Sequence, residues 1–196
     1  IDSLKLKGFD GVRILFAGTP AKKDLLGNLI AALLRVLKDT DRIQLVVVGV
    51  LLEQAVNYCS QKALDKYKNN LVFLGRIPQV QVPSYYHISD FSAIIREPSR
   101  KNTAGFPTKM AESMAAGCPV LMNQTSDLGD YATDGKNALI INDYSVDSIE
   151  AGLHRILQMS KDEIVSMKNA ARAVGESRFN YRSYLDTAKV FIAKIR

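Results

Sequence analysis

The chain has 196 residues, of which 47% are hydrophobic and 23% charged, and its formal net charge at pH 7 is +6. This balance is typical of a soluble globular domain, and the longest apolar run, residues 45–52, is far shorter than the roughly 18 residues that a membrane-spanning helix needs. Lysine and arginine occur in runs no longer than two, which argues against a nucleic-acid groove. Because the sequence starts at Ile1 rather than Met, we expect a fragment or a processed start.

Apolar runs of strand length recur along the chain. Most contain Val, Ile and Leu without polar alternation, as is typical of strands buried on both faces of a parallel sheet. The segment before them, residues 1–11, is expected to be a linker or an edge segment. The predicted strands are residues 12–17, 43–48, 71–74, 91–95, 120–122 and 138–141.

Apolar residues at helical spacing fill the gaps between these runs. Pro107 fits a first helical turn, and Gly117 lies just beyond the end of the same helix. The alternation predicts an α/β fold: a doubly wound, mostly parallel, Rossmann-like sheet of about six strands with helices on both faces and a helical C-terminal segment. Ligands of such sheets bind beyond the carboxyl ends of the strands, near a topological switch point. The predicted helices are residues 25–37, 55–67, 80–87, 107–116, 149–157, 162–176 and 183–195.

The loop after the first predicted strand could bind a phosphate. Gly18 would let a ligand approach the backbone closely. Lys22 and Lys23 stand at an expected helix start, where free N–H groups and the helix dipole favour an anion. The alternative is a solvated loop in which Asp24 caps the helix. Neither a Walker loop nor a dinucleotide fingerprint occurs, which counts against an ATPase and an NAD enzyme.

The loop after the fourth predicted strand leads into a second candidate anion site. Gly105 and the turn before Pro107 would expose backbone N–H groups at a helix start. Lys109 and Glu112 are three residues apart and therefore share one helix face. Glu112 could accept hydrogen bonds from a pair of ligand hydroxyls. The alternative is a plain Lys109–Glu112 surface ion pair, worth about a few tenths of a kcal/mol.

Cysteine and histidine usage predicts no metal site. Cys59 and Cys118 lie among apolar neighbours, and we expect both to be buried free thiols in a reducing compartment. His87 and His154 have no other candidate ligand near them, and no zinc-type spacing occurs.

Residues 105–120 resemble the donor motif of the group 1 family of retaining glycosyltransferases, whose members have two facing Rossmann-like domains (the GT-B fold). That motif reads G-F-x-x-x-x-x-E-x-[ML]-A-x-G-x-P-V. Four further stretches resemble the family in the same order, namely residues 14–23, 46–49, 72–78 and 134–139. The resemblance implies that residues 12–177 are the C-terminal domain, which binds a nucleotide sugar.

The resemblance also implies roles for individual residues. Gly75, Arg76 and Ile77 would hold the base through their backbone, and Glu112 would accept the ribose hydroxyls. Lys23 would meet the diphosphate and, with Glu112, is an implied catalytic residue. Family members transfer a sugar with retention and usually without a metal, so no cofactor is expected. The other expected donor-binding residues are Gly18, Thr19, Lys22, Arg96, Arg100, Gly105, Phe106, Pro107, Thr108 and Lys109.

Two positions depart from the family pattern. The family usually has Arg where this chain has Thr19, and a first Glu, which commonly contacts the donor sugar, where this chain has Ala104. We hypothesise that Arg96, Arg100 and Lys109 replace the missing positive charge.

The family also needs an N-terminal acceptor-binding domain that this sequence does not contain. Residues 178–196 are expected to form a helix that packs back on that domain, with an under-buried apolar stripe. The expected activity is transfer of a hexose-type sugar from a UDP or GDP donor to a glycan or lipid-linked acceptor, with little or no transfer by this chain alone. The stripe consists of Tyr184, Leu185, Ala188, Phe191, Ile192 and Ile195.

The resemblance further implies a bacterial, cytoplasmic enzyme of polysaccharide biosynthesis, and the basic charge would favour peripheral contact with the inner face of an anionic membrane. Two alternatives remain open at this stage. One is a non-catalytic binding domain of the same fold. The other is a protein similar to the sugar-nucleotide epimerases, which would want a histidine near the cleft.

Overall fold

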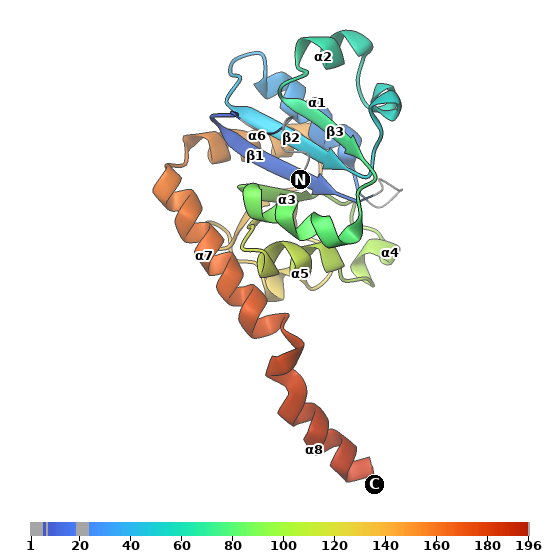
Figure 1. The fold of residues 1–196 in the computed structure, drawn as a ribbon, viewed down its shortest axis with the longest axis vertical. Coiled ribbons are helices and arrows are strands. Elements are labelled where there is room, and N and C mark those ends of the chain that lie inside the picture. The colour runs from blue at the N-terminus through green and yellow to red at the C-terminus, as the bar shows by residue number, and fades with distance from the viewer. Residues whose placement is uncertain (1–5, 7, 19–23, 196) are drawn as a thin grey trace.

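The computed structural model describes residues 6, 8–18 and 24–195, and its centre is a six-stranded parallel sheet (Figure 1). The strand order is β3-β2-β1-β4-β5-β6, so the direction of winding reverses between β1 and β4. This confirms the predicted Rossmann-like α/β fold and puts the switch point beside β1. The strands are β1 (Val12–Ala17), β2 (Ile43–Val48), β3 (Leu71–Gly75), β4 (Phe91–Ile94), β5 (Val120–Asn123) and β6 (Ala138–Ile141).

Helices cover both faces of the sheet, which is why nearly every strand residue is buried. One face packs against α1 (Leu26–Val36) and α6 (Val146–Gln158), which also contact each other. The other face packs against α3 (Val82–Ile88) and α5 (Thr108–Ala115). Next to α5 runs α7 (Lys161–Arg178), which leads into the C-terminal tail (Figure 1). The shorter helices are η2 (Leu52–Asn57), α2 (Gln61–Lys66), η3 (Gln79–Gln81), α4 (Arg100–Thr103), η4 (Leu128–Asp130) and η5 (Tyr181–Tyr184).

Several predicted boundaries were wrong for local reasons. The helix expected over residues 55–67 is two pieces, η2 and α2, because the Ser60 side chain accepts the Ala63 N–H and starts a new helix. Pro107 is the N-cap of α5 rather than part of its first turn. Gly117 follows α5 with φ +71°, a left-handed conformation suited to glycine at a helix end. The short helix α4 was not predicted at all.

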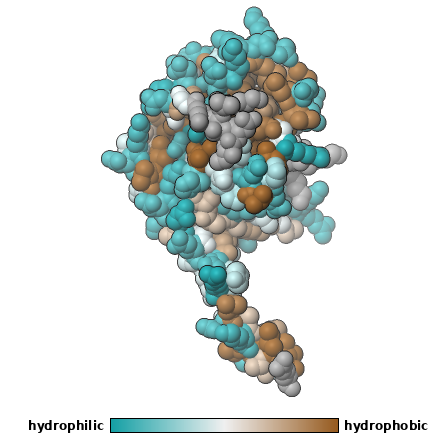
Figure 2. All heavy atoms as spheres, in the orientation of Figure 1, coloured by the Kyte–Doolittle hydropathy of each residue, from teal (hydrophilic) through white to brown (hydrophobic). Residues whose placement is uncertain are grey.

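The C-terminal helix α8 (Leu185–Ile195) projects away from the body of the domain (Figure 1). Every residue from 181 to 195 is exposed, including Phe191 at 66% and Ile195 at 69%. Figure 2 accordingly shows apolar side chains gathered on this tail. The predicted under-buried stripe is therefore confirmed. No helix in the described part of the chain is long and apolar enough to cross a membrane.

The expectations for the burial of the two cysteines and for residues 1–11 are confirmed only in part. Cys118 is buried, as expected, and burial raises the pKa of its thiol to about 12. Cys59 is only half-buried, at the turn between η2 and α2. Both thiols are free. Leu6 of the expected linker is buried, and its carbonyl accepts a hydrogen bond from Arg13 at 2.8 Å.

Candidate functional site

A cavity of about 360 Å3 opens at the carboxyl ends of β1, β2 and β3, where a ligand is expected in this fold. It brings together three strand ends, the turn after β3 and the start of α5. The residues that line it are Ala17, Gly18, Val48, Gly49, Arg76, Ile77, Gln79, Val82, Thr108, Lys109 and Glu112.

Backbone hydrogen bonds hold the three strand ends together at this cavity. The Gly18 N–H donates to the Val48 carbonyl at 3.0 Å, and the Gly49 N–H donates to the Gly75 carbonyl at 2.7 Å. Gly75 has φ +67°, which only glycine adopts readily, and this conformation turns the chain towards Arg76 and the cavity. The predicted base-holding turn is therefore at the cavity wall.

Lys109 enters the cavity from the first turn of α5. Its ammonium nitrogen lies 4.9 Å from the centre of the Phe16 ring and donates a hydrogen bond to Asp24 Oδ2 at 2.6 Å. A Cβ atom at Gly18 would lie 2.7 Å from the same nitrogen, so glycine is what leaves room for the lysine. The surface ion pair considered between Lys109 and Glu112 is not formed, because Lys109 pairs with Asp24 instead.

Asp24 is buried, and each of its carboxylate oxygens accepts a hydrogen bond from a cation. Oδ1 accepts from Arg96 Nε at 2.9 Å, and Oδ2 accepts from Lys109. Burial, the largest influence on this group, raises the pKa of Asp24, but the hydrogen bonds and charges of Lys109 and Arg96 outweigh burial and lower the pKa below its ordinary 3.8. The alternative in which Asp24 caps α1 is wrong, since the N-cap is Leu25 and no side chain caps this helix.

Glu112 lies one turn beyond Thr108 on α5 and lines the cavity together with Arg76 and Ile77. Its side chain is exposed, whereas Met110 and Met114 on the other side of the helix are fully buried. Lys109 and Glu112 thus face a shared cavity instead of each other. A carboxylate and an ammonium presented in this way can bind hydroxyl groups and an anion at neighbouring points.

Arg96 and Arg100, the other two residues hypothesised to replace the missing positive charge, do not line this cavity. Arg96 is 7% exposed, and its backbone is tied to β5 by two hydrogen bonds with the Asn123 side chain, at 2.9 and 2.7 Å. Arg100 is exposed on α4. Lys109 is therefore the one of the three hypothesised replacements that lines the cavity. Thr19, Lys22 and Lys23 lie outside the described residues.

Three predicted donor-binding residues before α5 help to build the loop and do not line the cavity. Phe106 packs edge-on against Tyr131, with ring centres 5.5 Å apart, and also lies 5.7 Å from the Phe179 ring. Pro107 is buried and Gly105 is half-buried. Sequence reasoning did not single out two residues that do line the cavity, Gln79 and Val82. Both come a few residues after the predicted base-holding turn at the end of β3, and this nearness in sequence is the signal that could have indicated them.

In the Asp134–Asn137 stretch, which also resembles the family, the polar side chains of Asp134 and Asn137 bind groups of the domain itself. Asp134 accepts the Ile140 N–H at 2.7 Å and pairs with Arg155 at 2.9 Å. Asn137 is 3% exposed and bridges the backbone of Thr133 and Tyr131. This stretch forms the tight turn into β6.

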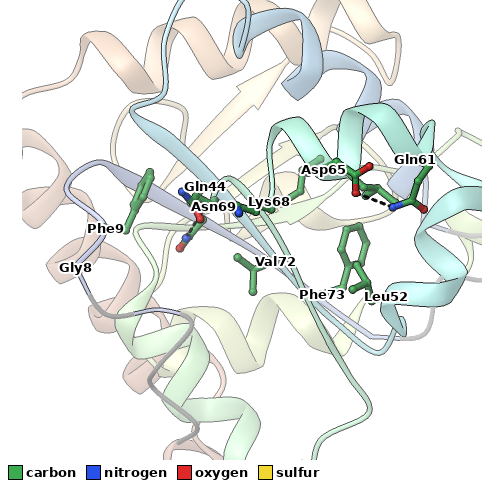
Figure 3. A pocket seen from close by; sticks show the side chains of 12 residues that line it. Gly8, Phe9, Gln44, Leu52, Gln61, Asp65, Lys68, Asn69, Val72 and Phe73 are labelled. Atoms are coloured by element: carbon green, nitrogen blue, oxygen red, sulfur yellow. Dashed lines mark hydrogen bonds between the residues drawn. The ribbon is translucent and has the colours of Figure 1, made fainter.

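A larger cavity, of about 760 Å3, lies along the edge strand β3 (Figure 3). Two of its polar side chains donate hydrogen bonds to protein groups: Gln61 donates to Asp65 at 2.9 Å, and Gln44 donates to the Asn69 carbonyl at 2.8 Å. It reaches Gly8 and Phe9 near the amino end of β1, away from the strand ends where ligands bind in this fold. The smaller cavity is therefore the better candidate. Within residues 6, 8–18 and 24–195, no group of His, Cys, Asp and Glu could hold a metal ion, and His87 and His154 are both exposed.

Comparison with known families identifies the chain. Residues 7–174 match the model of the family described as glycosyl transferases group 1. The chain belongs to this family. No curated protein sequence matches it.

Solved structures of other proteins show the same fold. The C-terminal domain of the group 1 protein LpcC from Francisella tularensis is 17% identical with a TM-score of 0.71, and the match covers 91% of this chain and 92% of that domain. Sucrose-phosphate synthase from Thermosynechococcus elongatus is 16% identical with a TM-score of 0.76, and the match covers 100% of this chain and 49% of that protein. Anabaena HepE in complex with UDP-glucose is 15% identical with a TM-score of 0.74, over 97% of this chain and 51% of that protein. This group 1 glycosyltransferase chain thus spans about half the length of the last two.

Proposed function

We propose that this chain is the donor-binding half of a retaining glycosyltransferase and that it binds a nucleoside diphosphate sugar in the small cavity at the strand ends. The observation that supports this most directly is the meeting of the Gly75–Ile77 turn, Glu112 and Lys109 around one cavity. Membership of the group 1 family supports it as well, as does the structure of HepE, which was solved with UDP-glucose.

In this proposal each wall of the cavity receives one part of the donor. The backbone at Arg76 and Ile77 holds the base, and Glu112 accepts hydrogen bonds from the ribose hydroxyls. Lys109 and the free N–H groups at the start of α5, which has no side-chain cap, meet the diphosphate. Lys23 remains a proposed contact to the diphosphate, since Gly18 and Asp24, the described residues that flank its loop, both lie against Lys109.

The proposed chemistry is transfer of a hexose-type sugar to a glycan or lipid-linked acceptor with retention and without a metal. As the sugar leaves, negative charge develops on the diphosphate, and positioned cations and a helix N-terminus stabilise it. The acceptor would bind to an N-terminal domain like those of the full-length relatives, so we expect this chain alone to transfer little or no sugar.

Calorimetric titration with UDP, GDP and ADP tests the proposal. We expect saturable binding of at least one of them, and loss of that binding in Glu112→Ala. Glu176→Ala is the matched control, because Glu176 is exposed on α7 and does not line the cavity. If the wild-type chain binds none of the three nucleotides, the proposal is wrong.

A second titration tests the role of Glu112. If Glu112 binds the ribose hydroxyls, removing the 2′-hydroxyl from the nucleotide should weaken binding to the wild-type chain by about tenfold. The same nucleotide change should have a smaller effect in Glu112→Gln, because the neutral amide oxygen accepts a weaker hydrogen bond from this hydroxyl than the carboxylate does.

One observation favours a second candidate, a non-catalytic binding domain of the same fold. Ala104, at the C-terminal cap of α4, has no carboxylate to contact a donor sugar. In that case the nucleoside diphosphate would bind as tightly as its sugar conjugate. If the chain is the proposed transferase, the sugar also contributes to binding. The affinity for the nucleotide sugar should then differ measurably from the affinity for the nucleoside diphosphate.

A further inference from the structure

Three charged side chains meet behind Gly18, where β1 ends. Asp24 lies between Arg96 and Lys109, with N–O distances of 2.9 and 2.6 Å. The Asp24 and Arg96 side chains are 7% and 9% exposed, and that of Lys109 is 21% exposed. The cluster therefore reaches solvent mainly through Lys109.

The charges of this cluster do not cancel. Two cations share one carboxylate, which leaves one positive charge in excess. Arg96 is buried and lies outside the cavity lining, whereas Lys109 is part of that lining. The excess charge is thus presented to the cavity at the Lys109 ammonium group. The carboxylate is the group that this cluster needs, because removing it would leave both cations without a counter-charge.

The Lys109 ammonium group is fixed by its surroundings. It contacts Asp24 on one side and the Phe16 ring on another, and it lies 2.7 Å from the point that a Cβ atom at Gly18 would occupy. A free lysine side chain samples many rotamers, and ordering it on binding would cost affinity. Within residues 6, 8–18 and 24–195, one of its three N–H donors is used, by Asp24, which leaves two for the oxygens of an anion.

We propose that Asp24 is a positioning residue, which holds the Lys109 ammonium group where it receives the diphosphate of the donor. This inference rests on the proposed function. Asp24 acts through Lys109 and does not itself line the cavity. If Asp24 acted only as a competing negative charge, removing that charge would strengthen diphosphate binding. If Asp24 positions Lys109, removing the Asp24 charge would weaken diphosphate binding. The direction of the change in affinity therefore distinguishes the two roles.

The test is Asp24→Asn, titrated with UDP, GDP or ADP by calorimetry and with the matching nucleoside by NMR. We expect the diphosphate to bind about tenfold more weakly and the nucleoside to bind as in the wild-type chain. Tighter or unchanged diphosphate binding would overturn the assignment. Asp147→Asn is the matched control, since it removes a carboxylate from the exposed ion pair with Arg35, and its affinities should match those of the wild type.

A double-variant cycle tests whether Asp24 acts through Lys109. Lys109→Met should weaken diphosphate binding, and adding Asp24→Asn to it should change the affinity by less than about twofold. A further tenfold loss in that background would show that Asp24 acts by another route and would overturn the assignment.

Asp24→Asn also leaves the buried charge of Arg96 without its carboxylate, so the double variant Asp24→Asn/Arg96→Gln removes both charges and guards against unfolding. It should show the same selective loss of diphosphate binding, and unchanged binding again overturns the assignment. Absence of nucleotide binding by the wild-type chain would overturn the proposed function and this inference with it. Wild-type binding that survives loss of the Asp24 carboxylate overturns this inference alone.

Discussion

Helices α5 and α8 both carry apolar side chains along one side, yet only α5 is built into the packed domain. Met110 and Met114 of α5 are fully buried in the cluster formed with the sheet and α7, while Lys109 and Glu112 face the small cavity. No residue of α8 is buried. An amphipathic sequence thus specifies a helix, but burial depends on what the rest of the chain places against it. In this domain the side chains of the candidate site lie on the helix that is packed into the domain.

The largest expected effect in this comparison is on the buried side of α5. Met114→Ala should lower the free energy of unfolding by about 2–5 kcal/mol, since it opens a cavity in a fully buried cluster. Urea denaturation followed by circular dichroism measures it, and Val190→Ala on α8 is the matched control. A loss below about 1 kcal/mol would show that α5 is no better packed than α8.

A smaller effect is expected where α7 presses on α5. A Cβ atom at Gly175 would lie 2.6 Å from the Ala115 backbone nitrogen. Gly175→Ala should therefore cost about 1–3 kcal/mol because it forces the helices apart. Gly27→Ala on α1 is the matched control: its Cβ would meet only Tyr58, at 3.9 Å, so the higher helix propensity of alanine should stabilise the chain by about 0.5–1 kcal/mol. Equal effects of the two changes would contradict close packing of α5 on α7.

The cluster of Asp24, Arg96 and Lys109 should make the free energy of unfolding depend on pH in the acid range. The folded-state pKa of Asp24 is lowered, so its contribution is complete above the ordinary value near 3.8 and is lost as the pH falls through the lowered value. Asp24→Asn should be less stable than the wild type at neutral pH and should show a flatter fall in stability below about pH 4. Asp186→Asn on α8, whose partner Lys189 is exposed, should leave the acid dependence unchanged. Parallel acid curves for wild type and Asp24→Asn would contradict this.

The smallest effect is expected on α8. Phe191→Ala should change the free energy of unfolding by less than about 0.5 kcal/mol, because the ring is already exposed in the folded chain. Urea denaturation of this variant and of the wild type in parallel measures the difference in the free energy of unfolding. A loss above about 1 kcal/mol would mean that α8 packs on the domain in solution, and the contrast with α5 would disappear.

Much of the fold could be predicted because its signals are local. The mainly apolar runs of β1 and β2, each with one polar residue at its second position, predicted those strand bounds to the residue, and runs of this kind are typical of a parallel sheet covered on both sides. The break between η2 and α2 was missed because a single serine, Ser60, outweighs the apolar spacing around it.

The candidate site was predictable only in part, because some of its contacts join distant segments. Helical spacing correctly put Lys109 and Glu112 on related positions of one helix, and the structure puts both at the cavity. Spacing could not show that Lys109 pairs with Asp24, which lies 85 residues earlier. Nor could it show that Arg96 is buried against the same carboxylate, because a sequence shows a charge but not the partner that burial requires.

The strand order has a consequence for how the domain is made. The β1 segment lies beside β4, and the Arg13 N–H donates to Asp90, 77 residues further along the chain. The cavity needs residues from Ala17 to Glu112, so a ribosome must synthesise more than half of the domain before the first and last of them can meet. Pairing of such distant segments slows folding, since a long loop must close first. We therefore expect the growing chain to depend on protection of β1 and β2 until α5 has emerged.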